Sequence, residues 1–348
     1  MTPKAAREAL RLIHNPPNPW HQGVVEHVGP PPLAVLELFE DRSRSALSKN
    51  DSPDLGFAFS VNPYRGCYHG CAYCYARPSH EQLDFGAGTD FERKLVYKPD
   101  IAALLRAAFD KPSWRGDLVA FSGNTDCYQP LESSLGLTRA CLRVCLEYRN
   151  PVGIVTKSAL VERDVELLAE LAQATHCTVS LSIPLDDAAQ ARALEPHAPA
   201  PARRYKAIER LAKAGVPVGV LVSPIIPGLS DSQIPAILTQ AREAGATFYG
   251  RSLLRLPGPV EEVFVHRLSL ALPHRAERVM NALRECRGGK LNDTRFGARM
   301  SGVGERWKAI AALADAHAQR LGYIRAPQVP DPSPFVRPQR GGEQLALW

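Results

Sequence analysis

Short apolar runs and amphipathic stretches alternate through the middle of this chain. The apolar runs resemble strands that are covered on both faces of a sheet, because few of their positions are charged. We expect strands at residues 57–62, 118–122, 152–156, 178–183, 216–222 and 247–253. Between them, apolar residues recur every three or four positions, which predicts helices at 101–109, at 160–172 and before Gly215 and Gly245.

This alternation predicts an α/β fold with a parallel sheet and right-handed crossovers. Six strands fit a partial, TIM-like (β/α)6 barrel at residues 56–256 better than a closed eight-stranded barrel. The proline-rich residues 1–55 are expected to form an irregular N-terminal arm. Helical patterns resume in a C-terminal extension at 257–325, and a proline-rich tail follows at 326–348. In folds of this kind the active site lies beyond the carboxyl ends of the strands.

Composition narrows the class of protein. The 348 residues are 45% hydrophobic and 22% charged, which is typical of a globular protein with a large core. A net charge of +6 is too mild to indicate nucleic-acid binding by itself. The most apolar stretch, 216–229, is interrupted by prolines and is too short to span a bilayer, so no membrane partner is expected. Eight cysteines without a visible export signal predict free thiols in the cytoplasm.

Three of those cysteines carry the main chemical signal. Cys67, Cys71 and Cys74 form a C-x₃-C-x₂-C motif directly after the first predicted strand. Short spacers let one loop wrap a compact metal cluster, and Gly66 and Gly70 relieve crowding in that loop. Three thiolates on an iron–sulfur cubane leave one iron open for chemistry. The alternative is a zinc site with His69 or His80 as fourth ligand, but zinc motifs usually pair two cysteines with a distant second pair.

The motif, with Tyr73 just before its last cysteine, resembles the signature of the radical S-adenosylmethionine (SAM) superfamily. The wider string at 62–77, NPYRGCYHGCAYCYAR, resembles the subgroup related to spore photoproduct lyase. The resemblance implies that Cys67, Cys71 and Cys74 ligate a 4Fe-4S cluster whose open iron binds SAM. It also implies reductive cleavage of SAM to a 5′-deoxyadenosyl radical that abstracts hydrogen from a substrate. An external one-electron reductant, of the flavodoxin or ferredoxin kind, is expected as a partner.

The same resemblance assigns SAM-binding roles to polar residues at the strand ends. Ser122 ends the second strand and Asn124 follows it, Lys157 follows the third strand, and Ser182 lies near the end of the fourth. Tyr73 would contribute from the cysteine loop. Without the resemblance, these residues are interpreted as an ordinary polar loop, a surface lysine and serines that bond the backbone.

Cys127 is the candidate catalytic residue outside the motif. Photoproduct lyase has a hydrogen-donating cysteine near the end of its second strand, but that position falls nearer Gly123 or Asn124 in this chain. Cys127 is therefore either a displaced hydrogen donor or a packed, inert thiol.

The sequence leaves three possibilities for the substrate and the activity. Nucleic acid is one possibility, supported by the subgroup resemblance and by a basic loop with Arg287, Lys290, Arg295 and Arg299, although a solvated loop is the simpler interpretation of those residues. A peptide or small-molecule substrate is the second possibility. The third is a non-enzymatic zinc or iron–sulfur module that transfers electrons. The specific reaction, lyase-like or other, does not follow from the sequence.

Overall fold

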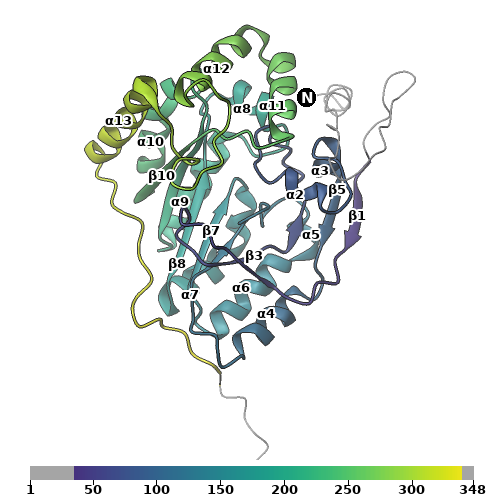
Figure 1. Ribbon diagram of the computed structural model, residues 1–348. Helices are drawn as coiled ribbons and strands as arrows, with labels where there is room; N and C mark the ends of the chain where they lie inside the picture. Colours follow the sequence, from purple (N-terminus) through teal and green to yellow (C-terminus); the bar gives the residue numbers. More distant parts are fainter. Residues whose placement is uncertain (1–34, 339–348) are drawn as a thin grey trace, which may run out of the picture.

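The computed structural model describes residues 35–338. Its centre is a seven-stranded sheet in which β2 is antiparallel to β3 and all other neighbouring pairs are parallel (Figure 1). The six parallel strands confirm the expected partial barrel. In sheet order the strands are β10 (Phe248–Leu253), β9 (Val218–Ile225), β8 (Cys177–Ser182), β7 (Val152–Thr156), β6 (Val119–Phe121), β3 (Phe59–Val61) and β2 (Leu47–Lys49).

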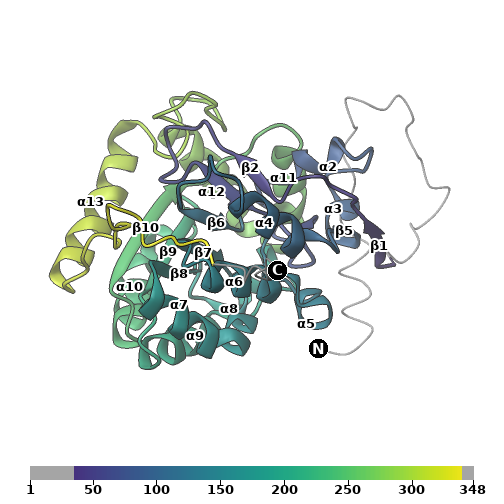
Figure 2. The same cartoon turned by 90° about the horizontal axis from the view of Figure 1, so that it is seen from below.

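Helices connect the parallel strands and cover the sheet from outside (Figure 2). The connecting helices are α4 (Ile101–Phe109), α6 (Leu137–Glu147), α7 (Val165–Ala174), α8 (Ala188–Leu194), α9 (Pro201–Lys213) and α10 (Ile234–Glu243). After β10 come α11 (Val260–Ala271), α12 (Pro273–Cys286) and α13 (Gly304–Arg320). Short elements complete this part of the chain: α2 (Pro78–Glu81), α3 (Thr89–Arg93), α5 (Glu132–Leu135), η1 (Ala159–Asp164) and η2 (Asp231–Gln233).

The N-terminal segment differs from the expectation of an irregular arm. Within it, β1 (Glu37–Glu40) and β2 form strands, and β2 extends the main sheet by pairing with β3. β1 joins a small second sheet with β5 (Lys94–Tyr97) and β4 (Tyr64–Arg65). Such edge pairing depends on distant partners, so the local pattern of residues 35–55 could not reveal it. Residues 1–34 lie outside the described part, and the proposed domain boundaries stay a prediction.

The core lies between the sheet and its helices. The thiols expected to be packing residues, Cys141, Cys145 and Cys177, are all buried there. Of the tail predicted at 326–348, residues 326–338 are described and return to α4 and α6. There Arg337 donates to the carbonyl oxygens of Phe109, Lys111 and Trp114, near the end of α4. No helix among the described residues has the length and apolar character needed to cross a membrane.

Candidate active site

The three motif cysteines lie on the loop between β4 and α2, and all three are free thiols. Cys67 and Cys71 are buried and Cys74 is half-buried. The loop needs its two glycines, because both have positive φ, +74° at Gly66 and +65° at Gly70. A Cβ at Gly66 would lie 2.9 Å from the Phe91 carbonyl oxygen. This close approach seats the cysteine loop against α3.

The thiols lie near enough to affect one another. Burial raises the pKa of Cys67 well above its usual range, and the charges of Asp126, Cys71 and Cys74 raise it further. Burial also raises the pKa of Cys74, but the Arg77 cation acts in the opposite direction and favours the thiolate. Across residues 35–338, no group of three His, Cys, Asp or Glu side chains is placed so that it could hold a single metal ion.

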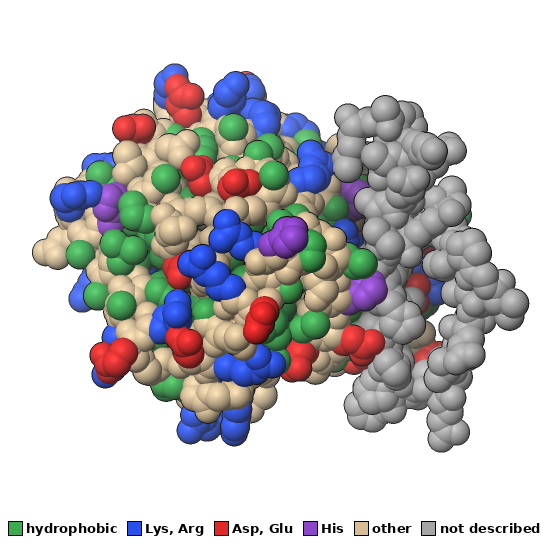
Figure 3. All heavy atoms as spheres, turned by 90° about the horizontal axis from the view of Figure 1, so that it is seen from above, with side chains coloured by type: hydrophobic (Ala, Val, Ile, Leu, Met, Phe, Trp, Pro, Cys, Tyr) green, Lys and Arg blue, Asp and Glu red, His purple; other side chains and the backbone are tan. Residues whose placement is uncertain are grey.

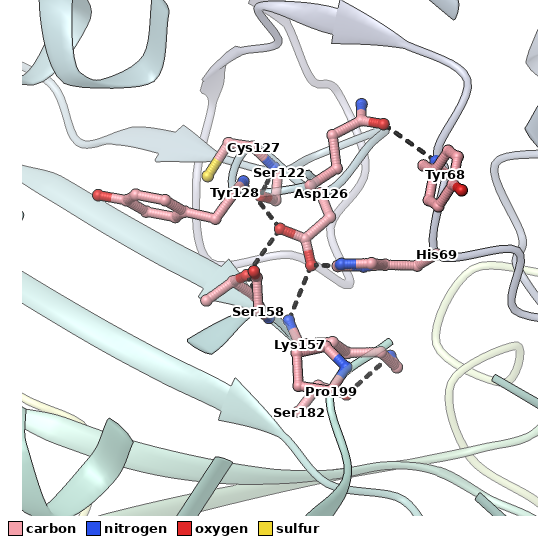
Figure 4. Close-up of polar contacts among 12 residues, drawn as sticks. Tyr68, His69, Ser122, Asp126, Cys127, Tyr128, Lys157, Ser158, Ser182 and Pro199 are labelled. Atoms are coloured by element: carbon pink, nitrogen blue, oxygen red, sulfur yellow. Dashed lines mark hydrogen bonds and ion pairs between the residues drawn. The ribbon is translucent and has the colours of Figure 1, made fainter. Parts of the chain in front are cut away.

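Asp126 connects this loop to the carboxyl ends of β6 and β7 (Figure 4). Its carboxylate accepts hydrogen bonds from Thr156 Oγ1 at 2.6 Å, the Lys157 amide at 2.8 Å and the Tyr128 amide at 2.9 Å. His69 Nδ1 lies 3.4 Å from Asp126 Oδ2. Burial by itself would raise the pKa of Asp126, but the His69 charge and the hydrogen bonds outweigh it and lower the pKa to about 2. An ionised, fully bonded carboxylate therefore joins the two strand ends to the cysteine loop.

Lys157 projects from the end of β7 toward β8 and β9. Its Nζ donates to Ser182 Oγ at 3.0 Å, and Ser182 Oγ donates to the Ser223 carbonyl at 2.8 Å. The ammonium lies 5.5 Å from the centre of the Tyr73 ring and 4.0 Å from Glu195 Oε1. The structure thus brings together three of the predicted SAM-binding residues, Tyr73, Lys157 and Ser182.

A buried ion pair supports that group and was not found from the sequence. Glu195 accepts a hydrogen bond from the Tyr73 hydroxyl and is paired with Arg204, which also donates to the Ser182 carbonyl at 2.9 Å. Burial opposes ionisation of Glu195, yet the Arg204 and Lys157 charges lower its pKa. Glu195 directly follows α8 and Arg204 lies on α9. Neither residue belongs to a sequence motif, so only the fold could show their role.

Ser122, Asn124 and Cys127 form a separate group on the loop after β6. Ser122 has a φ of +74° and accepts a hydrogen bond from the Cys127 amide at 2.8 Å. Asn124 Nδ2 donates to Ser79 Oγ at 3.1 Å. Cys127 is 1% exposed within the hydrophobic core, and its sulfur points away from Asp126 (Figure 4). This placement favours the packed-thiol interpretation of Cys127, and its role as hydrogen donor stays a prediction.

Two exposed aromatic rings and two arginines extend from the cysteine loop toward the C-terminal extension; we call Tyr75, Arg255, Phe296 and Arg299 the aromatic–arginine ledge. Tyr75 is 52% exposed, while its hydroxyl donates to the Gly123 carbonyl at 2.9 Å. Burial of the hydroxyl raises the pKa of Tyr75, and the Arg255 charge opposes this rise. Burial lowers the pKa of Arg255, and the Arg299 charge lowers it further. The three side chains are therefore close enough for their charges to interact.

The far end of the ledge is the basic loop noted in the sequence. Phe296 is 60% exposed, and the Arg299 guanidinium lies 4.7 Å from the centre of its ring. Arg299 is also held by Asp54 at 2.5 Å. By contrast, Arg287 is buried and donates to backbone carbonyls, among them those of Leu254 and Ser301. Arg287 therefore stabilises the backbone of the loop, whereas Phe296 is exposed on its surface.

Comparison with known proteins decides the family. The model of the radical SAM superfamily matches residues 61–241, more than half of the chain. This chain belongs to the radical SAM superfamily. An uncharacterized protein of Mycobacterium tuberculosis is 37% identical over 259 residues, which cover 74% of this chain and 76% of the relative. An uncharacterized protein of Methanocaldococcus jannaschii is 27% identical over 246 residues, covering 71% of this chain and 88% of the relative.

Among solved structures, the fold is similar to that of spore photoproduct lyase complexed with dinucleoside spore photoproduct. The TM-score is 0.60 with 14% sequence identity, and the match covers 83% of this chain and 82% of the other. A mutant of that lyase with bound SAM and the same dinucleoside gives a TM-score of 0.59, also with 14% identity, over 84% and 82% of the two chains. The match extends well beyond the residues of the family model and confirms the radical SAM partial-barrel fold.

Radical SAM proteins bind a 4Fe-4S cluster and SAM. The site fits both groups. Three free thiols on one loop match the three thiolates of such a cluster, whose ligands stand farther apart than those of a single ion. The histidines considered as zinc ligands have other neighbours in the described structure: His69 faces Asp126, and His80 packs against Phe85 and Phe91. When bound, the cluster and SAM supply a one-electron route to a hydrogen-abstracting radical, and radical SAM enzymes take that electron from an external reductant.

Proposed function

We propose that this protein is a radical SAM enzyme that abstracts hydrogen from a nucleic acid. Cys67, Cys71 and Cys74 would hold the cluster. Tyr73, Lys157 and Ser182 would hold SAM, with Ser122 and Asn124 on the neighbouring loop. In this assignment Lys157 offers a cation to the SAM carboxylate. The eight free thiols suit a reducing cytoplasm, which we propose as the compartment.

The aromatic–arginine ledge is the observation that carries the substrate assignment. Exposed rings can stack on bases, and guanidinium groups can bind phosphates or stack as well. The ledge begins at Tyr75, which directly follows the cluster ligand Cys74, so a base stacked there would lie next to the reaction centre. The buried Nε of Arg255 has no hydrogen-bond partner among the described residues. This nitrogen is covered, so a phosphate would bind the Arg255 guanidinium through the part of the half-buried side chain that solvent can reach.

The mild net charge of +6 argues for a short contact. Basic side chains on the face seen from above are interspersed with acidic ones and do not form one continuous patch (Figure 3). We therefore expect binding of a few nucleotides at the ledge, with a shallow dependence of affinity on salt.

Two measurements test the proposal. The first is anaerobic reconstitution with iron and sulfide, followed by reduction in the presence of SAM, which should yield 5′-deoxyadenosine. A protein that takes up zinc only and leaves SAM intact would refute the enzyme class.

The second measurement is the affinity for short single-stranded DNA and RNA at several salt concentrations. Phe296→Leu removes the stacking face and should weaken binding by about 10-fold, the equivalent of one lost base–aromatic stack. Arg255→Gln should weaken binding and make the salt dependence shallower. Lys308→Gln, which removes one charge from the exposed face of α13, is the matched control and should change little. Equal effects of all three variants, or no measurable binding, would instead favour a peptide or small-molecule substrate.

A further inference from the structure

A buried ion pair next to the cysteine loop lies outside the residues assigned to the cluster ligands and to SAM. It joins Arg77, three residues after Cys74, to Glu92 on α3, with Nη2 2.5 Å from Oε1. Arg77 is 0% exposed and Glu92 is 1% exposed. Burying two charges is expensive, and a hydrophobic pair is often at least as stable, so stability alone is a weak reason for such a pair.

Arg77 uses its guanidinium to hold the backbone of a cluster ligand. Nε and Nη2 both donate to the Cys71 carbonyl, at 3.1 and 2.9 Å. Nη1 donates to the carbonyls of Ala87 and Gly88 at 2.8 and 2.9 Å. Every nitrogen of the Arg77 side chain therefore donates at least one hydrogen bond. A lysine could not reproduce this fork, because its ammonium lacks the planar arrangement of donors.

Glu92 supports the same loop from α3. A Cβ at Gly70 would lie 3.0 Å from the Glu92 carboxylate, so the loop backbone passes directly against this negative charge. The preceding residue, Phe91, accepts a hydrogen bond from the Cys67 amide at 2.9 Å. The loop is thus fixed at Cys67 by the backbone of α3, at Gly70 by contact with Glu92, and at Cys71 by Arg77.

We propose that Arg77 and Glu92 are positioning residues that hold the cluster loop and set the reduction potential of the cluster with opposite signs. Reduction adds one negative charge to the cluster. The nearby Arg77 cation stabilises the reduced form and raises the potential, whereas Glu92 destabilises that form and lowers the potential. The electron comes from the external one-electron reductant. The inference requires the cluster but is independent of the substrate.

The test uses the reconstituted protein and two readouts besides turnover: iron and sulfide content, and the cluster midpoint potential from a redox titration followed by electron paramagnetic resonance. Arg77→Gln should make the potential more negative, and Glu92→Gln should make it more positive. Arg77→Lys keeps the charge and loses the fork, so its potential should stay near the wild-type value while a chelator removes its iron faster. The double variant Arg77→Gln/Glu92→Gln should return toward the wild-type potential.

Arg163→Gln is the matched control, because Arg163 pairs with two other buried carboxylates, Glu132 at 2.6 Å and Asp164 at 2.9 Å, which belong to α5 and η1 and not to α3. It should lower thermal stability without moving the potential. Shifts of the same sign in Arg77→Gln and Glu92→Gln would overturn the proposal, as would unshifted potentials with full iron content. If Arg77→Gln retains no cluster, Glu92→Gln and Arg77→Lys decide: a positive shift in the first and faster iron loss in the second support the proposal, and wild-type behaviour in both refutes it.

Discussion

Asp126→Asn offers a quantitative test of how the strand ends are joined to the cysteine loop. The ordinary aspartate pKa of 3.8 falls to about 2 in the folded protein. Since one pKa unit corresponds to about 1.4 kcal/mol, ionisation contributes about 2 kcal/mol to stability at neutral pH. An asparagine amide also turns an N–H toward an existing donor, either the Lys157 amide or the pair formed by Thr156 and Tyr128. An unsatisfied buried donor costs about 1–3 kcal/mol.

These effects overlap, so we expect a total loss of about 2–4 kcal/mol. For a chain of 348 residues this corresponds to a fall in Tm of about 3–5 °C. The assay is thermal unfolding followed by far-ultraviolet circular dichroism, with Asp51→Asn as a control at an aspartate whose side chain is 82% exposed. The control should change stability by less than about 0.5 kcal/mol.

The pH dependence gives an independent check. Because folding lowers the pKa of Asp126, its contribution is fully present above the unfolded pKa near 3.8 and is lost as the pH falls toward 2. The stability gap between wild type and Asp126→Asn should therefore be constant from pH 5 to 7 and shrink below pH 4. A variant that melts within 1 °C of wild type at pH 7, or a gap that does not change between pH 7 and pH 3, would refute this reasoning.

Three further predictions concern the cluster, SAM and the sheet. Cys71→Ala leaves two motif thiols and should abolish cluster assembly; iron content near the wild-type value would contradict the ligand assignment. Lys157→Met should weaken SAM binding by about 10-fold in equilibrium titrations of the reconstituted protein, with unchanged affinity as the opposing result. Gly219→Ala should destabilise the protein by about 1–3 kcal/mol, because a Cβ there would lie 2.2 Å from the buried Phe248 ring. Gly153→Ala, whose Cβ would have no neighbour nearer than 3.7 Å, is the control in urea unfolding, and equal losses in both variants would disprove the steric argument.

Much of the barrel was predictable because its strands are locally encoded. The segments at 152–156, 178–183 and 247–253 match β7, β8 and β10 within one residue at each end, and the helix at 101–109 matches α4. Their apolar positions follow the period of the element that they form. The sequence did not predict α11, because Pro257, Gly258 and Pro259 interrupt the preceding pattern. In the structure Pro259 is the N-cap residue of this helix.

Some residues of the candidate site could likewise be predicted from the sequence, and others could not. The cysteines were recognisable because eight consecutive residues contain all three, so any fold keeps them on one short segment. Lys157 and Ser182 could be proposed because parallel strands end at the same edge of a sheet. Glu195 and Arg204 could not be proposed from the sequence. Glu195 contacts Tyr73 and Arg204 only after α8 and α9 have packed against the sheet.

The amino-acid sequence alone thus determined the metal-binding loop, the alternation of strands and helices, and the family to which the chain belongs. These features depend on spacing and periodicity within short segments. Tertiary structure decided which charges surround the cluster thiols, how β2 extends the sheet, and that Phe296 and Arg255 share a surface with Tyr75. Such contacts join residues that are far apart in the chain, so their energies exist only once packing has brought the partners together and removed water from between them.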